Sequence, residues 1–254
     1  HGTQMAALIA ASGKGGGYVG VAPEARILSV PVVTDDPAED IDPAEERLRL
    51  ESPLARGIRY AVNQGAQVIS LSIGAYGVRR LDRDAVAYAL SRGVVLVASV
   101  GNDGDSAYSR ETGTSYWSFP AGYSGVIGVG AVDRRGRPAP FSNDNLSVLV
   151  AAPGVDVPMV TRGGGYGKGS GTSPAAALVA GVVALIKAKY PDMRPELVAR
   201  ALVMGARGRP AAGYDDHVGF GVVDAAAALR AAGGLTGHRR SHPVSQDLRF
   251  GPGP

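Results

Sequence analysis

The sequence predicts an α/β protein of three layers (α/β/α), with a mainly parallel sheet between two layers of helices. Short apolar runs alternate with segments of helical periodicity, which is the order that βαβ units produce. The runs at 66–73 and 93–100 are apolar throughout, as expected for strands that helices cover on both faces. Further strands are predicted over 25–33, 125–132 and 146–153.

Helical patterns fill the segments between and after these runs. They predict helices over 3–12, 52–64, 82–92, 173–190, 195–205 and 223–232. Pro195 and Glu196 suit a first helical turn, where a missing N–H costs nothing and the helix dipole favours an acid. The apolar run at 175–186 is too short to cross a bilayer, so it predicts a buried helix and no membrane span within the chain.

Composition narrows the class of protein. The chain has 254 residues, of which 45% are apolar and 19% charged, an ordinary globular balance. The net charge is only +3, and no aromatic residues interleave with the small arginine clusters, so no nucleic-acid partner is predicted. Because there is no cysteine, disulfides, thiol catalysis and cysteine-ligated metals are excluded.

One domain is predicted over 1–232. The segment 233–254 is rich in Gly and Pro and lacks apolar periodicity, which indicates a flexible tail or linker.

The segment GSGTSPAAALVAGVVALIKAKYP (169–191) places Ser173 just before a long apolar helix. Pro174 fits the first helical turn, and the preceding glycines allow another segment to approach closely. Unpaired N–H groups and the positive end of the helix dipole would stabilise an oxyanion formed beside a nucleophilic serine. Ser173 is therefore a candidate nucleophile, and a simple helix cap is the alternative.

Two further segments carry candidate polar groups. In LVASVGNDGD (96–105), Asn102 follows an apolar strand and offers an uncharged amide donor, which suits an oxyanion hole; an ordinary turn is the alternative. In HGTQMAALIAA, His1 precedes an apolar helix, where it is either a general base or a residue without function.

Taken together and in this order, these three segments resemble the subtilisin-like serine proteases. The resemblance extends over almost the whole chain. Further segments match in the order of that family: GVAPEARILSVPV (20–32), VISLSIG (68–74), SFPAGYSGVIGVGAVD (118–133), FSN (141–143), VAAPGVDV (150–157) and GFGVVDAAAAL (219–229). The resemblance implies a subtilisin-like sheet whose first strand or strands are missing from this sequence. The tail makes a cell-wall-associated enzyme resembling the mycosins a further expectation.

The resemblance implies a serine endopeptidase that works through an acyl-enzyme and needs no cofactor. Ser173 would be the nucleophile and His1 the general base. The side chain of Asn102 and the N–H of Ser173 would form the oxyanion hole. Ser72, Ile73 and Gly74 would pair with the backbone of a peptide or protein substrate as an added strand. A secreted or cell-surface location and a pro-segment are expected from the family alone.

The sequence departs from the family in the acid that orients the histidine. That aspartate precedes the histidine in the family, so no residue here matches it, and we expect it upstream of an N-terminally truncated sequence. The chain alone is then expected to be a poor protease, because losing the acid can cost about 10⁴ in rate. If the longer protein also lacks the aspartate, an inactive domain that binds peptides or a partner is the alternative.

Smaller departures follow. Pro174 and Ala177 replace residues that the family commonly has there, but the oxyanion donor is the N–H of Ser173 itself. The loop 12–20 lacks the oxygen ligands that calcium needs, and no metal site is predicted.

In the family, the acidic stretch 34–46 falls at the wall of the upstream substrate pockets. Its carboxylates would there favour basic side chains in the substrate; a solvated loop without such a role is the alternative. The glycine-rich segments 12–17 and 163–170 do not match the phosphate-loop pattern.

Overall fold

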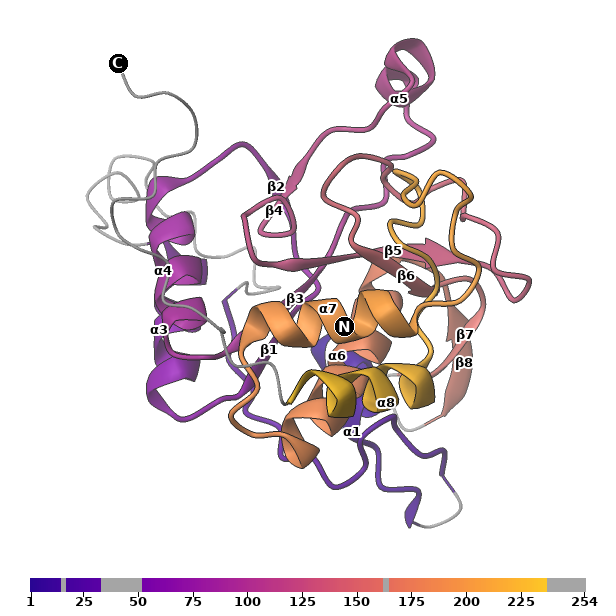
Figure 1. The fold of residues 1–254 in the computed structure, drawn as a ribbon. Helices are drawn as coiled ribbons and strands as arrows, with labels where there is room; N and C mark the ends of the chain where they lie inside the picture. The colour runs from indigo at the N-terminus through magenta and orange to yellow at the C-terminus, as the bar shows by residue number, and fades with distance from the viewer. Residues whose placement is uncertain (15–16, 33–51, 162–164, 237–254) are drawn as a thin grey trace.

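The computed structural model describes residues 1–14, 17–32, 52–161 and 165–236. Predictions for the acidic stretch 34–46 and for residues 237–254 of the tail therefore lie outside the described residues. The predicted α/β architecture with a mainly parallel sheet is confirmed (Figure 1).

The central sheet has four parallel strands in the order β1-β3-β5-β6. They are β1 (Val68–Leu71), β3 (Val95–Ser99), β5 (Ile127–Val132) and β6 (Val150–Pro153). Every residue of β3 and β5 is buried, which explains why their sequences are apolar on both faces. Two short antiparallel pairs lie outside this sheet: β2 (Ala75–Tyr76) with β4 (Ser118–Phe119), and β7 (Val157–Val160) with β8 (Tyr166–Gly169).

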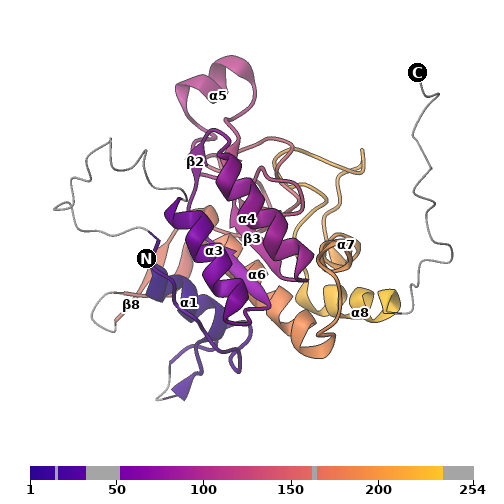
Figure 2. The ribbon, with the colours of Figure 1, turned by 90° about the vertical axis from the view of Figure 1, so that its left-hand side faces the viewer.

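Alternate residues of the strands enter two separate cores. Leu96 and Ala98 pack with α3 (Pro53–Asn63) and α4 (Arg80–Ser91), which lie side by side on one face of the sheet (Figure 1, Figure 2). Val95 and Val97 pack on the other face. The helices of that face are α6 (Thr172–Lys189), α7 (Pro195–Gly205) and α8 (Ala225–Leu235). These cores make the three layers.

Helix α6 is the central helix of the molecule. It contacts all four strands of the main sheet and the N-terminal helix α1 (Gly2–Ala10), which adds Met5 and Leu8 to a small third core with Ala177. By length and composition alone α6 would suffice to cross a membrane, but 67% of it is buried inside the protein. Its apolar surface is therefore used by the core.

One prediction on the outer elements is wrong. The strand predicted over 25–33 does not form in residues 25–32, because apolar residues make a strand only with a hydrogen-bonding partner; Ile27 and Leu28 instead stay about half exposed. The helix predicted over 223–232 corresponds to α8, which continues to Leu235 because that side chain is buried in the core. The sequence also gave no indication of α5 (Ala107–Thr112), which has a single capping serine and little apolar surface.

Candidate active site

Ser173 lies in the first turn of α6, next to the C-terminal ends of β1 and β3. The turn before it requires glycine, since Gly171 has a φ of +153°. The Ser173 side chain is half-buried, and its main-chain N–H belongs to the first turn, whose N–H groups have no partner within the helix. The residue therefore combines a reachable hydroxyl with an available backbone donor.

Asn102 is fixed against the start of the same helix. Its Oδ1 accepts hydrogen bonds from the Thr172 N–H (2.8 Å) and from the Thr172 hydroxyl (3.0 Å). Because the carbonyl end of the amide is used in this way, the Nδ2 end is left as a donor, and it lies 3.6 Å from the position that a Cβ would take at Gly171, two residues before Ser173. Asn102 is exposed, so a substrate can reach that donor.

The loop that carries Asn102 is fixed on its other side by Asn143, which is completely buried. Asn143 accepts from the Asp103 N–H (2.6 Å) and donates to the carbonyl of Tyr116 (3.2 Å). Gly101 has a φ of +109°, and a Cβ there would lie 2.5 Å from Asn143 Nδ2. The close approach of these two segments thus explains why residue 101 is glycine.

The predicted substrate-pairing residues follow β1. The Ser72 hydroxyl donates to the carbonyl of Ser173 (3.3 Å), which joins this segment directly to the start of α6. Ile73 packs against the core of α3 and α4, while Gly74 is exposed. A Cβ at Gly74 would lie 2.2 Å from Ser118 Oγ, so glycine permits the pairing of β2 with β4 beside it.

His1 is the N-cap residue of α1 and is exposed; its side chain makes no capping hydrogen bond. Helix α1 packs on α6, which carries Ser173. Among the described residues, hydrogen bonds attach Ser72 to Ser173 and Asn102 to Thr172, so both segments meet the first turn of α6, and His1 is not part of this group.

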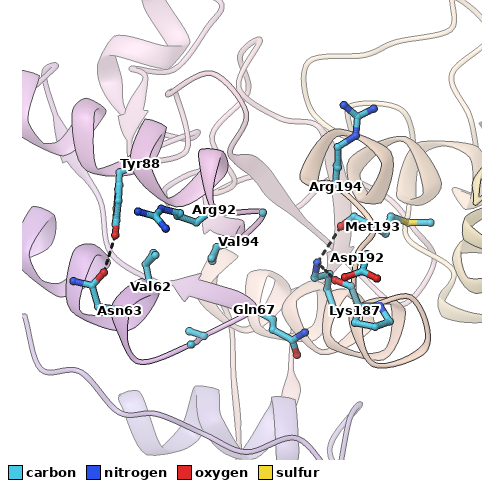
Figure 3. A pocket seen from close by; sticks show the side chains of 14 residues that line it. Val62, Asn63, Gln67, Tyr88, Arg92, Val94, Lys187, Asp192, Met193 and Arg194 are labelled. Carbon is cyan, nitrogen blue, oxygen red and sulfur yellow. Dashed lines mark hydrogen bonds between the residues drawn. The ribbon is translucent and has the colours of Figure 1, made fainter. Parts of the chain in front are cut away.

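A pocket of about 810 Å³ opens at the opposite end of the sheet (Figure 3). Gln67 and Val94, which line it, precede β1 and β3, whereas the group above follows those strands. Burial lowers the pKa of Lys187 in its wall, and the ammonium donates to the carbonyls of Pro191 and Met193. This lysine closes the turn between α6 and α7, which is a structural role.

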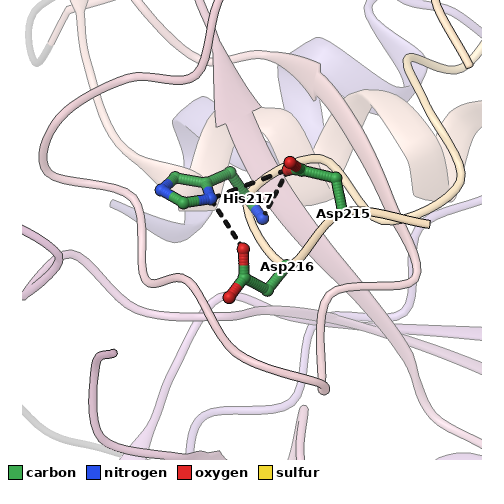
Figure 4. Close-up of side chains that lie close together, drawn as sticks. All are labelled: Asp215, Asp216 and His217. Atoms are coloured by element: carbon green, nitrogen blue, oxygen red, sulfur yellow. Dashed lines mark hydrogen bonds and ion pairs between the residues drawn. The ribbon is translucent and has the colours of Figure 1, made fainter. Parts of the chain in front are cut away.

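Asp215, Asp216 and His217 form a cluster in the turn before α8 (Figure 4). Their side chains could offer three ligands to a metal ion. The His217 Nδ1 lies 2.8 Å from Asp216 Oδ1, and Asp215 Oδ1 accepts from the His217 N–H (2.9 Å). These hydrogen bonds account for the cluster as part of the turn, so we assign it no metal.

A serine at the N-terminus of a buried helix, with an amide held against the same turn at the C-terminal edge of a parallel sheet, is an arrangement that suits the chemistry of a serine hydrolase. The family model described as "Subtilase family" matches residues 1–221. The chain therefore belongs to the subtilase family.

Individual relatives agree with this assignment. Fervidolysin of Fervidobacterium pennivorans is 37% identical over 252 aligned residues, covering 91% of this chain and 34% of the relative. Subtilisin BL of Lederbergia lenta is 35% identical, covering 91% of this chain and 77% of the relative. The crystal structure of MycP1 from Mycobacterium smegmatis superimposes with a TM-score of 0.72 at 29% identity, covering 100% of this chain and 74% of that one. The chain spans about a third of the first curated relatives that it matches.

Sequence reasoning missed two residues of the site. They are Thr172, which directly precedes Ser173, and Asn143, which ends the segment FSN (141–143). Nothing in the sequence around either residue indicates its role. Their contacts with the Asn102 loop join positions 70 and 40 residues apart in the chain, respectively. No local pattern indicates such contacts, although a buried side-chain amide always needs partners.

Proposed function

We propose that this chain is the catalytic domain of a serine endopeptidase that hydrolyses peptide bonds through an acyl-enzyme. The observation that supports it best is that Asn102 is hydrogen-bonded through Oδ1 to Thr172, the residue before Ser173, which leaves its Nδ2 and the Ser173 N–H as two donors at the start of α6. Two such donors would stabilise the oxyanion of a tetrahedral intermediate, and losing one typically costs about 10²–10³ in turnover. The membership of the subtilase family agrees with this chemistry.

In this proposal Ser173 attacks the carbonyl carbon of the peptide. His1 accepts the serine proton and later donates it to the leaving amine, oriented by an aspartate outside this sequence. Ser72, Ile73 and Gly74 pair with the substrate backbone as an added strand, which needs no particular substrate side chain. By family resemblance we also place the enzyme outside the cytoplasm, as a secreted or cell-surface protein.

The test is labelling of the full-length natural protein with a fluorophosphonate probe, followed by mass spectrometry of its peptides. We expect the label on Ser173 and none on the Ser173→Ala variant. Ser170→Ala is the matched control, because Ser170 is an exposed serine three residues earlier and its hydroxyl only accepts from the Asp156 N–H. If folded wild-type protein remains unlabelled, the alternative of an inactive peptide-binding domain is favoured instead.

A further inference from the structure

One hydrogen bond connects the two segments that flank the proposed reaction site. Tyr76 lies in β2, two residues after the substrate-pairing Gly74, and Asp103 directly follows Asn102. The Tyr76 hydroxyl donates to Asp103 Oδ2. The bond therefore links the substrate-pairing segment to the loop that holds the oxyanion donor.

The ring of Tyr76 is held in place although it is 55% exposed. Its backbone pairs with Ser118 in β4. Its ring lies against Tyr116, with centroids 5.4 Å apart, and Tyr116 stacks on Tyr108 at 3.7 Å. Offset and tilted aromatic pairs of this kind favour a fixed ring orientation. The hydroxyl is thus presented to Asp103 from a supported position.

Asp103 has its other anchors on the far side of the loop. Its N–H donates to Asn143 (2.6 Å), and its carbonyl accepts from the Ser109 hydroxyl (2.8 Å). Neither partner belongs to the substrate-pairing segment. Among the described residues, the Tyr76 hydroxyl gives the Asp103 side chain its hydrogen bond to that segment.

We propose that Tyr76 is a positioning residue: through Asp103 it fixes the spacing between the Asn102 donor and the strand that binds substrate. The inference rests on the proposed function, because it gives Asn102 its role in the oxyanion hole. Such donors must be held close to their productive geometry, and a displacement of about 1 Å can cost about 10²-fold in rate.

The charge of Asp103 adds a second reason for this contact. A free carboxylate next to Asn102 would repel the negative charge that develops on the substrate oxygen. The Tyr76 hydroxyl donates a hydrogen bond to that carboxylate and so holds it in one position. Burial of the phenol and its hydrogen bond to Asp103 raise the pKa of Tyr76 to about 12, so the hydroxyl keeps its proton over the whole range in which the enzyme would work.

The test compares Tyr76→Phe with Tyr108→Phe in the full-length natural protein. Both changes keep the ring and remove one hydroxyl from the same aromatic group, but only the first removes the bond to Asp103. We expect Tyr76→Phe to lower kcat for peptide substrates by about tenfold with KM little changed, as expected when a transition-state donor is displaced. Tyr108→Phe should leave both constants near the wild-type values.

A double-mutant cycle with Asp103→Ala shows whether Tyr76 acts through Asp103. We expect Tyr76→Phe to add nothing once Asp103 is replaced. Fully additive losses, or a Tyr76→Phe enzyme as fast as the wild type, would overturn the inference.

Amide hydrogen exchange of residues 101–104 gives a result that does not depend on activity. It should be faster in Tyr76→Phe than in Tyr108→Phe, and equal rates would refute the positioning role. A wild-type protein without any Ser173-dependent hydrolysis would refute the proposed function, while the exchange rates still decide whether Tyr76 holds the loop.

Discussion

At the scale of single residues, Thr172 decides which way the Asn102 amide faces. Its N–H and hydroxyl both bind Asn102 Oδ1, and its hydroxyl also lies 3.2–3.3 Å from the main-chain oxygen and nitrogen of Gly101. The side chain is only 1% exposed, so these bonds form without competition from water. A small hydroxyl residue thus orients a neighbour 70 positions away in the chain.

We expect Thr172→Val to lower kcat by about tenfold and to leave KM nearly unchanged, because valine keeps the shape and the main-chain N–H but loses the hydroxyl bonds to Asn102 Oδ1 and to Gly101. The loss of buried hydrogen bonds should also cost about 1–2 kcal/mol in the free energy of unfolding. Steady-state kinetics and urea denaturation measure the two effects. Thr172→Ser restores the hydroxyl and should recover kcat; a serine variant as slow as the valine variant would contradict this role.

Local sequence patterns predict some residues of the candidate site and give no indication of others. Ser173 and Asn102 stand where a helix begins and a strand has just ended, which periodicity and turn residues reveal. The orientation of Asn102, by contrast, depends on Thr172 and Asn143, which the fold brings from distant positions. The role of Tyr76 could not be predicted either, because a strand of two residues is too short to show an alternation of apolar and polar residues.

At the scale of elements, the crossing of α7 and α8 depends on one glycine. A Cβ at Gly205 would lie 2.4 Å from the backbone nitrogen of Ala228 and 2.7 Å from its Cα. The two helices therefore touch backbone to backbone at this point. Ala201 and Ala228 beside it are completely buried, so the neighbours cannot move apart without opening the core.

We expect Gly205→Ala to destabilise the protein by about 1–3 kcal/mol, the usual cost of overpacking. Helix propensity alone would favour alanine by about 1 kcal/mol, but the clash is with rigid backbone and outweighs it. Gly233→Ala in α8 is the matched control, since its Cβ would meet only the hydroxyl of Tyr190, the far end of a side chain that can turn away. Equal unfolding free energies for both variants would show that the crossing is looser than described.

Elements also differ in how well the sequence predicts them. Strands β3 and β5 were found because burial on both faces leaves a continuous apolar run. The segment 25–32 has a similar composition but no ladder, since a strand is defined by its partner as much as by its own residues. Composition reports burial and propensity, and it does not report pairing.

At the scale of the whole molecule, Asp224 links the last helix to the rest of the fold. It caps α8 by accepting from the Ala227 N–H (2.8 Å), and it forms an ion pair with Arg207, which follows α7. The hydrogen bond from Ala227 and the guanidinium of Arg207 lower the pKa of Asp224 below its ordinary value of 3.8. The carboxylate is therefore stabilised by folding.

Because the pKa is lower in the folded than in the unfolded chain, this stabilisation is complete above about pH 4 and disappears as the pH falls through the folded value. Asp224→Asn keeps the capping oxygen but loses the charge. We expect its Tm to be lower than the wild-type Tm at neutral pH, with the gap closing in acid. Thermal melts at several pH values measure this, with the exposed Asp105→Asn as control; a gap that does not change with pH would argue against the assignment.

The strand order of the central sheet has a consequence for the order in which the protein forms during synthesis. β1, β3, β5 and β6 pair in the order in which they are synthesised, and α6 follows all four. Ser173, the proposed nucleophile, and Thr172, which orients Asn102, both arrive with α6. If Ser173 is the nucleophile, a growing polypeptide has these four strands before it has its nucleophile, and it could not form an acyl-enzyme while they are being made.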